Sequence, residues 1–168
     1  MKFFNGQIKF LAFLFSFGLF LYFFAFPFII EGNSMLNTFH NHDRIIVSRI
    51  LSKIQIKRGD IVICKFNNKP IIKRVIALPG EHVFINNNFV YVNDKLIKEP
   101  YILDYGLAEE KIIDFVLSDN EYFIMGDNRN SSIDSRIFGP VNKKNIVAKV
   151  LFKFFPRFSF VNYNWEEQ

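Results

Sequence analysis

The feature that most constrains this chain is an apolar run near its N-terminus, from Phe10 to Ile30, which contains no charged residue. As an α-helix, these roughly 21 residues would be about 31 Å long, which matches the hydrocarbon thickness of a bilayer. A cleavable export signal would have a shorter apolar core and small residues before its cleavage site, whereas this run ends in the letters FAFPFII. We therefore expect residues 1–30 to form a cytoplasmic tip and an uncleaved transmembrane anchor.

The charges that flank this run predict its orientation. Lys2 and Lys9 precede it, and Glu31 is the first charge after it. Because positively charged flanks stay in the cytoplasm, we expect a cytoplasmic N-terminus in the cell (inner, cytoplasmic) membrane. Residues 31–168 would then form an extracytoplasmic domain on the periplasmic side of a single-pass protein.

Composition limits the partners of the chain. Its 168 residues carry a formal net charge of +5, and the basic residues are scattered rather than gathered along one helix. Together with the expected location, this scatter argues against a nucleic-acid partner. The positive charge is better explained by attraction to the anionic lipids of a bilayer. The single cysteine, Cys64, cannot form an intramolecular disulfide, and its apolar surroundings predict a buried thiol.

The residues after Glu31 have the pattern of a β domain. Short apolar runs rich in β-branched residues alternate with Gly, Pro, Asn and Asp, which predicts strands separated by turns. No amphipathic segment of helical length appears there. We expect a mostly β, antiparallel domain that is closed or folded on itself like a barrel. The expected strands are residues 43–51, 60–66, 70–78, 82–85, 89–93, 112–117, 121–125 and 145–155.

Ser34 is the first candidate for chemistry, because it directly follows the apolar run and precedes His40, His42 and Asp43. A serine hydroxyl becomes a useful nucleophile only when a neighbouring base takes its proton. A histidine oriented by Asp43 would imitate a Ser-His-Asp triad, yet closeness in sequence is weak support for a triad, and the same residues suit a polar turn. Their spacing could also hold a metal, but His82 is the only other histidine in the chain.

Lys73 is the second candidate base. It lies between apolar residues on both sides, as expected of a mostly buried strand. A lysine acts as a base near neutral pH only if its pKa is lowered, and burial without a carboxylate partner has that effect. The neighbouring Arg74 cannot serve, because its guanidinium stays charged. The residues alone leave a third interpretation open, in which Ser34 is an ordinary turn residue.

Four short motifs, taken together, resemble those of the type I signal peptidases, also called leader peptidases. These are membrane-anchored serine proteases with a Ser/Lys dyad that remove signal peptides from exported proteins. The motifs occur in the family's order after an apolar N-terminus, and the resemblance covers almost the whole chain. They read GNSMLNT in residues 32–38, RGDIV in 58–62, KRVIALPGE in 73–81 and GDNRNSSIDSR in 126–136.

The resemblance implies a role for each matching residue. Ser34 would be the nucleophile, Lys73 the general base, and Ser132 a hydrogen-bond partner that directs the lysine. The backbone N–H of Ser34 would hold the oxyanion. The other matched residues would support the site: Asp134 and Arg136 as an ion pair, and Asp127, Asn128 and Arg129 as parts of the same loop.

Two positions in the first motif differ from many relatives. Gly32 stands where many bacterial relatives have a second serine that helps the oxyanion hole. Asn37 stands where the family has proline, which fixes its own φ and restrains Leu36 before it. Asn tolerates turn geometries, including left-handed ones, so the loop that presents Ser34 could keep its shape with less preorganisation.

The implied activity is cleavage of signal peptides from preproteins after small residues in an Ala-X-Ala-like pattern, without a cofactor or a metal. Met35 and Ile72 flank the dyad and would form walls of shallow substrate pockets. The aromatic and basic residues 150–160 fit a core strand or a segment whose end lies in the membrane interface. Two alternative functions remain: a narrow-substrate Ser/Lys processing protease of a conjugation or organelle inner-membrane type, and a non-catalytic membrane-anchored β domain that binds exported peptides.

Overall fold

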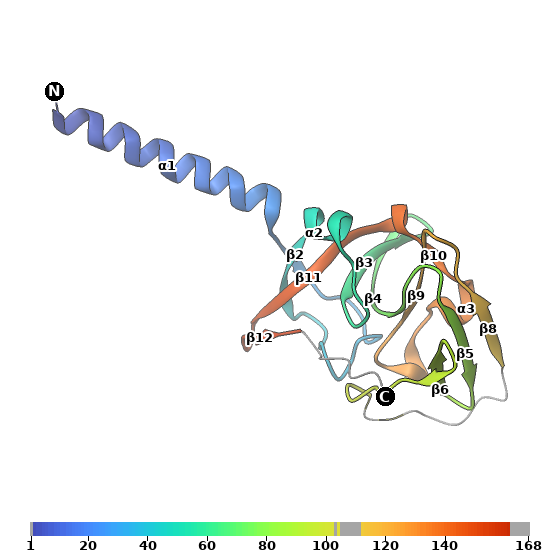
Figure 1. The fold of residues 1–168 in the computed structure, drawn as a ribbon. Helices are drawn as coiled ribbons and strands as arrows, with labels where there is room; N and C mark the ends of the chain where they lie inside the picture. The colour runs from blue at the N-terminus through green and yellow to red at the C-terminus, as the bar shows by residue number, and fades with distance from the viewer. Residues whose placement is uncertain (1, 103, 105–111, 162–168) are drawn as a thin grey trace.

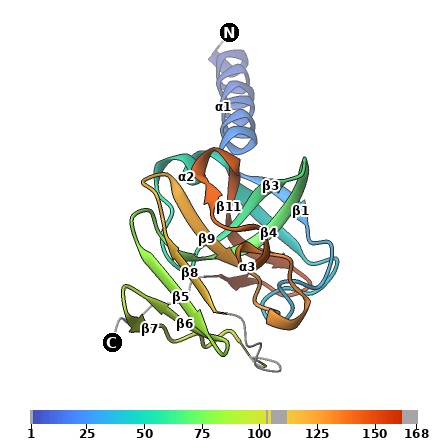
Figure 2. The ribbon, with the colours of Figure 1, turned by 90° about the vertical axis from the view of Figure 1, so that its right-hand side faces the viewer.

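The computed structural model describes residues 2–102, 104 and 112–161. The long helix α1 (Lys2–Phe24) extends away from a β-rich body, as two views at right angles show (Figure 1, Figure 2). The strand pairs among the described residues are antiparallel. The expected fold class, a mostly β antiparallel domain, is therefore confirmed.

The larger sheet carries the residues that the sequence singled out for chemistry. Its hydrogen-bonded order is β1-β2-β11-β3-β4-β9-β10, and β12 pairs with β11. Over the described part of the chain this path is open, with β1 and β10 at its edges, rather than a closed barrel. The strands are β1 (Phe26–Ile29), β2 (Arg44–Ser48), β3 (Ile61–Phe66), β4 (Lys69–Ala77), β9 (Glu121–Met125), β10 (Val141–Asn142), β11 (Ile146–Phe155) and β12 (Ser159–Phe160).

The smaller sheet has the order β7-β6-β5-β8 and packs against the larger one. Its strands are β5 (His82–Asn86), β6 (Phe89–Val92), β7 (Lys95–Leu96) and β8 (Ile113–Val116). Side chains of β5 and β6 form one buried cluster with Ile76 of β4 and with Phe123 and Met125 of β9. Since β4 and β9 belong to both this cluster and the large sheet, they hold the two sheets together.

Asparagine-rich turns fix the register of the hairpins. Both central residues of the β3–β4 turn, Asn67 and Asn68, have positive φ, and so do Asn87 and Asn88 between β5 and β6. Such turns match the twist of the strands that they join, and asparagine is among the residues that adopt positive φ most readily. The register that results places Lys73 of β4 opposite Val62 of β3.

The apolar run that the sequence predicted as one helix is divided between two structures. Helix α1 ends at Phe24, and β1 begins two residues later and pairs with β2. Pro27, which has no backbone donor and disfavours a helical residue before it, lies in this edge strand, where proline is tolerated. Among the residues that the structure describes, no helix is both long and apolar enough to cross a membrane. The transmembrane anchor stays a prediction.

One expected strand ends early. Residues 43–51 were expected to be extended, but β2 stops at Ser48 and helix α2 (Arg49–Ile54) follows. Ser48 is the N-cap of that helix, since its Oγ accepts a hydrogen bond from the backbone N–H of Leu51 at 3.3 Å. The other short helical segments are η1 (Arg129–Ser131), α3 (Ser135–Phe138) and η2 (Lys143–Asn145).

The packing between the sheets predicts which aromatic residue carries stability. Phe123 is 0% exposed and Phe89 is 53% exposed. We expect Phe123→Ala to lower the free energy of unfolding by about 3–5 kcal/mol, because it leaves a cavity between the sheets. Phe89→Ala, the matched control, is expected to cost less than about 1 kcal/mol. Urea unfolding of the detergent-solubilised protein, followed by circular dichroism, measures both, and equal costs would contradict this packing.

Candidate active site

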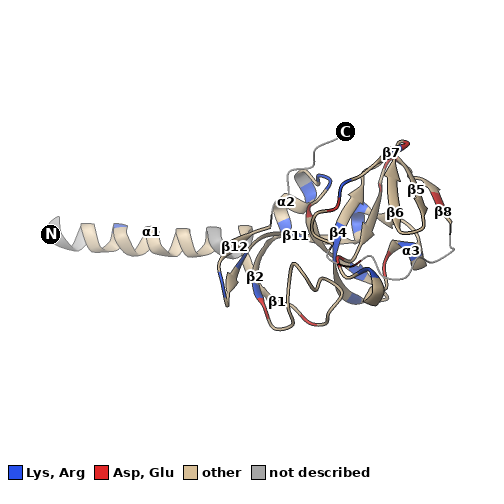
Figure 3. Cartoon of the chain, turned by 90° about the horizontal axis from the view of Figure 1, so that it is seen from below, with Lys and Arg blue, Asp and Glu red and all other residues tan. Residues whose placement is uncertain are grey.

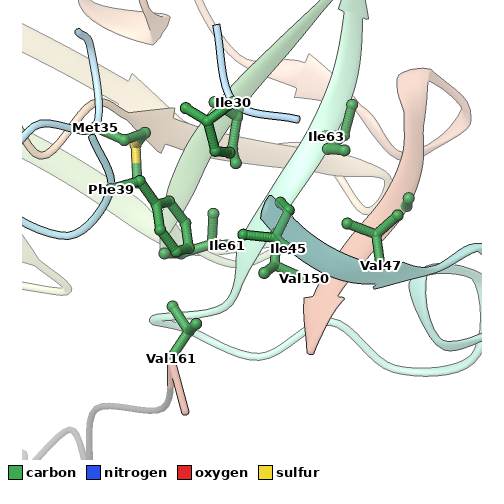
Figure 4. Close-up of a cluster of buried hydrophobic side chains, with 11 residues drawn as sticks. Ile30, Met35, Phe39, Ile45, Val47, Ile61, Ile63, Val150 and Val161 are labelled. Carbon is green, nitrogen blue, oxygen red and sulfur yellow. The ribbon is translucent and has the colours of Figure 1, made fainter. Parts of the chain in front are cut away.

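Ser34 lies in a tight loop that leads from β1 toward β2. Backbone hydrogen bonds close this loop, from Leu36 N–H to Asn33 C=O at 3.0 Å and from Phe39 N–H to Met35 C=O at 2.8 Å. Met35 and Phe39 are buried in the core cluster of the large sheet (Figure 4). These two side chains fix the loop to the core of the large sheet, while Ser34 stays half-buried at the surface.

Lys73 reaches Ser34 from the middle of β4. Its Nζ donates to Ser34 Oγ at 2.7 Å and to the carbonyl of Ile72 at 2.9 Å, and the residue is only 3% exposed. No carboxylate of a described residue forms an ion pair with it. Burial lowers the pKa of Lys73 below the ordinary value of 10.5, although the charge of Asp134 acts in the opposite direction. The structure thus places a hydroxyl and a neutralisable amine at hydrogen-bond distance.

Gly126, at the end of β9, allows the backbone to pass directly beneath the Ser34 loop. A Cβ at this position would lie 2.3 Å from Ser132 Oγ and 2.5 Å from the backbone oxygen of Ser34, so a side chain there would displace both. The next residues hold the Ser34 loop from the same side. The N–H of Asn128 donates to the Ser34 carbonyl, and Asn128 Nδ2 donates to the Asn33 carbonyl, both at 3.1 Å.

Ser132 lies close to the dyad but does not make the predicted contact. Its Oγ is buried and forms no hydrogen bond with Lys73, whereas the Ser132 side chain helps to lower the pKa of Asp134. The same Oγ is one of three atoms that leave no room for a side chain at Gly126, together with Ser132 Cβ and the backbone oxygen of Ser34.

Asp127 and Arg74 form a fully buried ion pair behind the dyad. Arg74 donates from Nε and Nη2 to the two carboxylate oxygens at 2.8 and 2.6 Å, and both side chains are inaccessible to solvent. The Nη1 of Arg74 donates to the Gly59 carbonyl at 2.9 Å, and Thr38 donates from Oγ1 to Asp127. Sequence reasoning missed Arg74 and Thr38. The sequence did contain a sign of the Arg74 ion pair, because Arg74 is a second cation inside the apolar stretch that holds Lys73. A buried cation of this kind needs a carboxylate partner.

Asp134 pairs with Arg136, as the resemblance implied. Arg136 donates from Nε and Nη2 to the two oxygens of Asp134, each at 2.9 Å, and Gly126 N–H donates to Asp134 at 2.9 Å. Burial alone would raise the pKa of Asp134, but the hydrogen bonds and charge of Arg136 outweigh burial and hold it below its ordinary value. Asp134 therefore stays a carboxylate that belongs to Arg136.

A second buried pair, missed from the sequence, braces the same loop. Arg129 donates to both carboxylate oxygens of Glu99, and Tyr101 donates its hydroxyl to Glu99 Oε1 at 2.6 Å. The Nε of Arg129 donates to the Gly126 carbonyl at 3.1 Å. The Arg74 guanidinium lies over the Tyr101 ring, with its Cζ atom 4.0 Å from the ring centroid. This pair therefore connects residues near the small sheet to both the Gly126 segment and the Asp127 pair.

A cleft of about 440 Å³ opens beside the dyad, between β1 and the beginning of β4. Ile72 lines it, as expected of a pocket wall. The same expectation for Met35 was wrong, because Met35 points into the core, where it anchors the loop. The lining residues are Pro27, Phe28, Ile29, Glu31, Ser34, Pro70, Ile71, Ile72 and Lys73.

The histidines near Ser34 form a turn. The His40 N–H donates to Asp43 Oδ2 at 2.9 Å, and the His42 N–H donates to the Ile30 carbonyl at 2.9 Å. Asp43 also accepts from Lys153 Nζ at 3.1 Å, so its carboxylate is engaged away from either imidazole. Within the described part of the chain, no group of three or more His, Cys, Asp or Glu side chains is placed to hold a metal ion.

Cys64 is a core residue of β3, as its apolar surroundings predicted. It is buried and forms no disulfide, and burial raises the pKa of its thiol to about 12. The sulfur therefore stays a thiol at physiological pH and has no part in nucleophilic chemistry.

Comparison with known proteins gives a consistent result. The family model described as "Signal peptidase, peptidase S26" matches residues 5–155. Signal peptidase I S of Bacillus subtilis is 36% identical over 141 residues, which is 77% of each chain, and signal peptidase I of Bacillus amyloliquefaciens is 37% identical over 77% of this chain and 76% of its own. A signal peptidase I crystal structure from Enterococcus faecalis is 28% identical, covers 55% of this chain and 93% of its own, and has a TM-score of 0.49.

The loop geometry makes a prediction about Asn37. Its φ is +94°, a value that the proline ring, fixed near about −65°, cannot adopt. We expect Asn37→Pro to lower the free energy of unfolding by more than about 1 kcal/mol. We also expect it to slow peptide cleavage by on the order of 100-fold, the effect of displacing Ser34 by about 1 Å.

Asn37→Gly is the matched control for this experiment, since glycine adopts positive φ without strain. It should leave cleavage and stability close to those of the parent protein. A proline variant that cleaves as fast as the parent would show that the loop does not need this backbone conformation.

Proposed function

As a member of the signal peptidase family, peptidase S26, this chain is a serine peptidase that hydrolyses peptide bonds, and we propose that Ser34 and Lys73 are its catalytic dyad. The observation that carries the proposal is the 2.7 Å contact between Ser34 Oγ and a buried amine that has no carboxylate partner among the described residues. A base whose pKa is lowered toward the working pH takes a proton more effectively than an ordinary lysine.

The reaction follows from this geometry. Neutral Lys73 takes the hydroxyl proton of Ser34 while Oγ attacks the carbonyl of the scissile bond. The protonated lysine then gives that proton to the leaving amine, and an acyl-enzyme forms on Ser34. Water, with Lys73 again as the base, releases the signal peptide and regenerates the serine. We propose that Ser132, whose buried Oγ lies close to the Ser34 backbone and Gly126, holds the ammonium between these steps.

The backbone N–H of Ser34 is the proposed oxyanion donor. A preorganised donor aimed at the developing negative charge is one of the strongest sources of rate enhancement in acyl transfer. Gly32 brings no side-chain hydroxyl, and its φ of +91° belongs to the region that favours glycine. A serine introduced at position 32 would therefore strain the loop as it added a donor.

The cleft beside the dyad suits an extended signal-peptide segment. Strand β9 pairs with β4 only from Arg74 onward, so among the described strands Pro70, Ile71 and Ile72 have a neighbour on one side only, the β3 side. A preprotein segment can add itself there as a further strand, in the manner of β-augmentation. Ile72 is part of the cleft wall next to Lys73, where a branched side chain would favour small substrate residues, as in an Ala-X-Ala-like cleavage site.

Helix α1 is the proposed membrane anchor of the enzyme. Its large apolar side chains are exposed, among them Phe10, Leu11, Phe13, Phe15 and Phe17. Figure 3 shows almost no charge along the part of α1 that is drawn in colour, and a helix that is apolar all round needs an apolar surrounding. Lys2 and Lys9 favour a cytoplasmic N-terminus, which would put the body on the outer side of the cell membrane.

The dyad makes the central prediction about activity. With a purified full-length chain in detergent and an Ala-X-Ala precursor, we expect Ser34→Ala and Lys73→Met each to reduce cleavage by at least about 1,000-fold. Because the neutral amine is the base, the rate of the parent should rise with pH through the lowered pKa of Lys73, with a midpoint below 10.5. Ser118→Ala and Lys69→Met, at exposed positions, are the matched controls.

Two outcomes would favour the alternatives. Binding of precursor peptides without turnover and without an acyl adduct on Ser34 would indicate a non-catalytic peptide-binding domain. Cleavage of one precursor out of a broad panel would indicate a narrow-substrate processing protease of the conjugation or organelle inner-membrane type. Loss of cleavage in His42→Ala, with activity retained in Lys73→Met, would restore the histidine as the base.

The anchor can be tested by placing charge on α1. Each lysine at the centre of a spanning helix costs about 2.5–3.5 kcal/mol of insertion free energy. We expect Phe13→Lys with Phe17→Lys to release the chain from membranes in alkaline carbonate, whereas the parent stays in the pellet. The matched control, Phe89→Lys with Leu96→Lys, adds the same charge at exposed apolar positions of the body and should stay with the membrane. Release of the parent itself would contradict an anchor.

A further inference from the structure

A second cleft, of about 430 Å³, lies where α1 joins the body. Six elements line it: β1, which begins two residues after α1 ends, helix α2, strands β3, β4 and β11, and η2. It shares Phe28 and Pro70 with the catalytic cleft, so the two are neighbours. We call it the cationic cleft, and its lining is Phe26, Phe28, Arg49, Lys53, Ile63, Lys65, Pro70, Lys144, Ile146, Val147 and Ala148.

The rim of the cationic cleft is positively charged without compensation. Arg49 and Lys53 come from α2, Lys65 from β3 and Lys144 from η2, and all four side chains are exposed. The lining contains no Asp or Glu, and none of the four cations forms an ion pair with a described residue. Four cations that converge on one opening without a carboxylate repel one another unless an anion lies between them. Charge complementarity therefore points to an anionic occupant.

The floor of the cleft is apolar. Phe26, Phe28 and Ile63 provide aromatic and branched side chains, and Ala148 also lines it. The Arg49 guanidinium lies over the Phe26 ring, with its Cζ atom 4.5 Å from the ring centroid. This contact holds the charge of Arg49 next to the apolar floor. A cleft of this size encloses one drug-sized ligand. A molecule with an anionic head and an apolar chain can contact both the charged rim and the apolar floor. A free anion would contact the rim alone.

The position of the cationic cleft in the fold indicates which kind of molecule with an anionic head and an apolar chain it binds. Helix α2 contacts α1, and Figure 3 shows α2, with its basic residues in blue, near the end of α1. If α1 spans the membrane as proposed above, the cationic cleft faces the headgroup layer of the outer surface. We propose that this cleft binds one anionic phospholipid, with the phosphate among Arg49, Lys53, Lys65 and Lys144 and the upper part of an acyl chain on the apolar floor.

Binding at this site is separable from catalysis. None of its four cations belongs to the dyad or lines the catalytic cleft, so we expect cleavage in neutral detergent to proceed without them. Because Phe28 and Pro70 line both clefts, a bound lipid would also fix one wall of the catalytic cleft. The lipid would therefore be part of the surface on which the preprotein lies.

The test uses the full chain in a neutral detergent, titrated with short-chain phosphatidylglycerol and, in parallel, with phosphatidylcholine of the same chain length. Native mass spectrometry counts the bound lipids. We expect one phosphatidylglycerol to bind with saturation and phosphatidylcholine to bind much more weakly. Since a basic residue near an anionic headgroup contributes about 1 kcal/mol, or about fivefold, Lys53→Gln with Lys144→Gln should weaken binding about 25-fold.

The matched control removes the same charge elsewhere. Lys95→Gln with Lys98→Gln, at exposed positions in and just after β7, should leave the affinity unchanged. Equal weakening by both double variants, or equal affinity for the two lipids, would overturn the proposal. So would competition by inorganic phosphate alone at a comparable affinity, which would indicate a soluble-anion site, or tighter binding of an acidic peptide. Peptide cleavage measured on the same samples keeps the result separate from the dyad.

Discussion

The structure is organised around a buried amine that has no carboxylate of its own among the described residues. Lys73 is enclosed by β3, β4 and the Ser34 loop, and its Nζ donates hydrogen bonds to a hydroxyl and a carbonyl. Two buried carboxylates, Asp127 and Asp134, lie near enough to influence its pKa. Each of them is held by an arginine, Arg74 or Arg136. These ion pairs keep the carboxylates from becoming partners of Lys73, which would raise its pKa and disable it as a base.

This arrangement depends on a close approach of two distant chain segments. The Ser34 loop rests on Gly126 and on hydrogen bonds from Asn128, while Arg129 and Glu99 hold the same segment from the side of the small sheet. Removing one partner of a buried pair costs about 3–5 kcal/mol, more than replacing both by apolar residues. The pairs around the site therefore specify one geometry for Ser34 and Lys73 rather than adding much net stability.

Periodicity and turn residues were sufficient to predict the strands that carry the site. The apolar run around Lys73 has little room for water on either face, and β4 is buried from Lys73 to Ala77. Local signals that compete with periodicity caused the errors: the Ser48 cap converted the end of an expected strand into α2, and Pro27 divided the N-terminal apolar run. Residues 105–111, which the sequence predicted as a loop or one helical turn, lie outside the described part of the chain.

Side-chain partnerships over long separations could not be predicted in the same way. The contacts of Arg74 with Thr38 and Asp127 span 36 and 53 residues, and periodicity tells which face a residue occupies, not which distant residue faces it. Met35 shows the same limit, because its place beside Ser34 suggested a pocket wall but the loop turns it into the core. The motif resemblance singled out Lys73 as the partner of Ser34, and the 2.7 Å contact between them spans 39 residues, which spacing alone could not predict.

Catalysis by this dyad depends most directly on the protonation of Lys73. Its side chain can be followed by NMR in protein labelled with ¹³C at lysine Cε, with Lys73→Met to assign the signal, while pH is raised through the alkaline range. A Lys73 signal that titrates clearly below 10.5 is the predicted result, since burial without a carboxylate favours the neutral amine. A signal that titrates at or above 10.5 would mean that Lys73 is an ordinary ammonium, and it would contradict the proposed base.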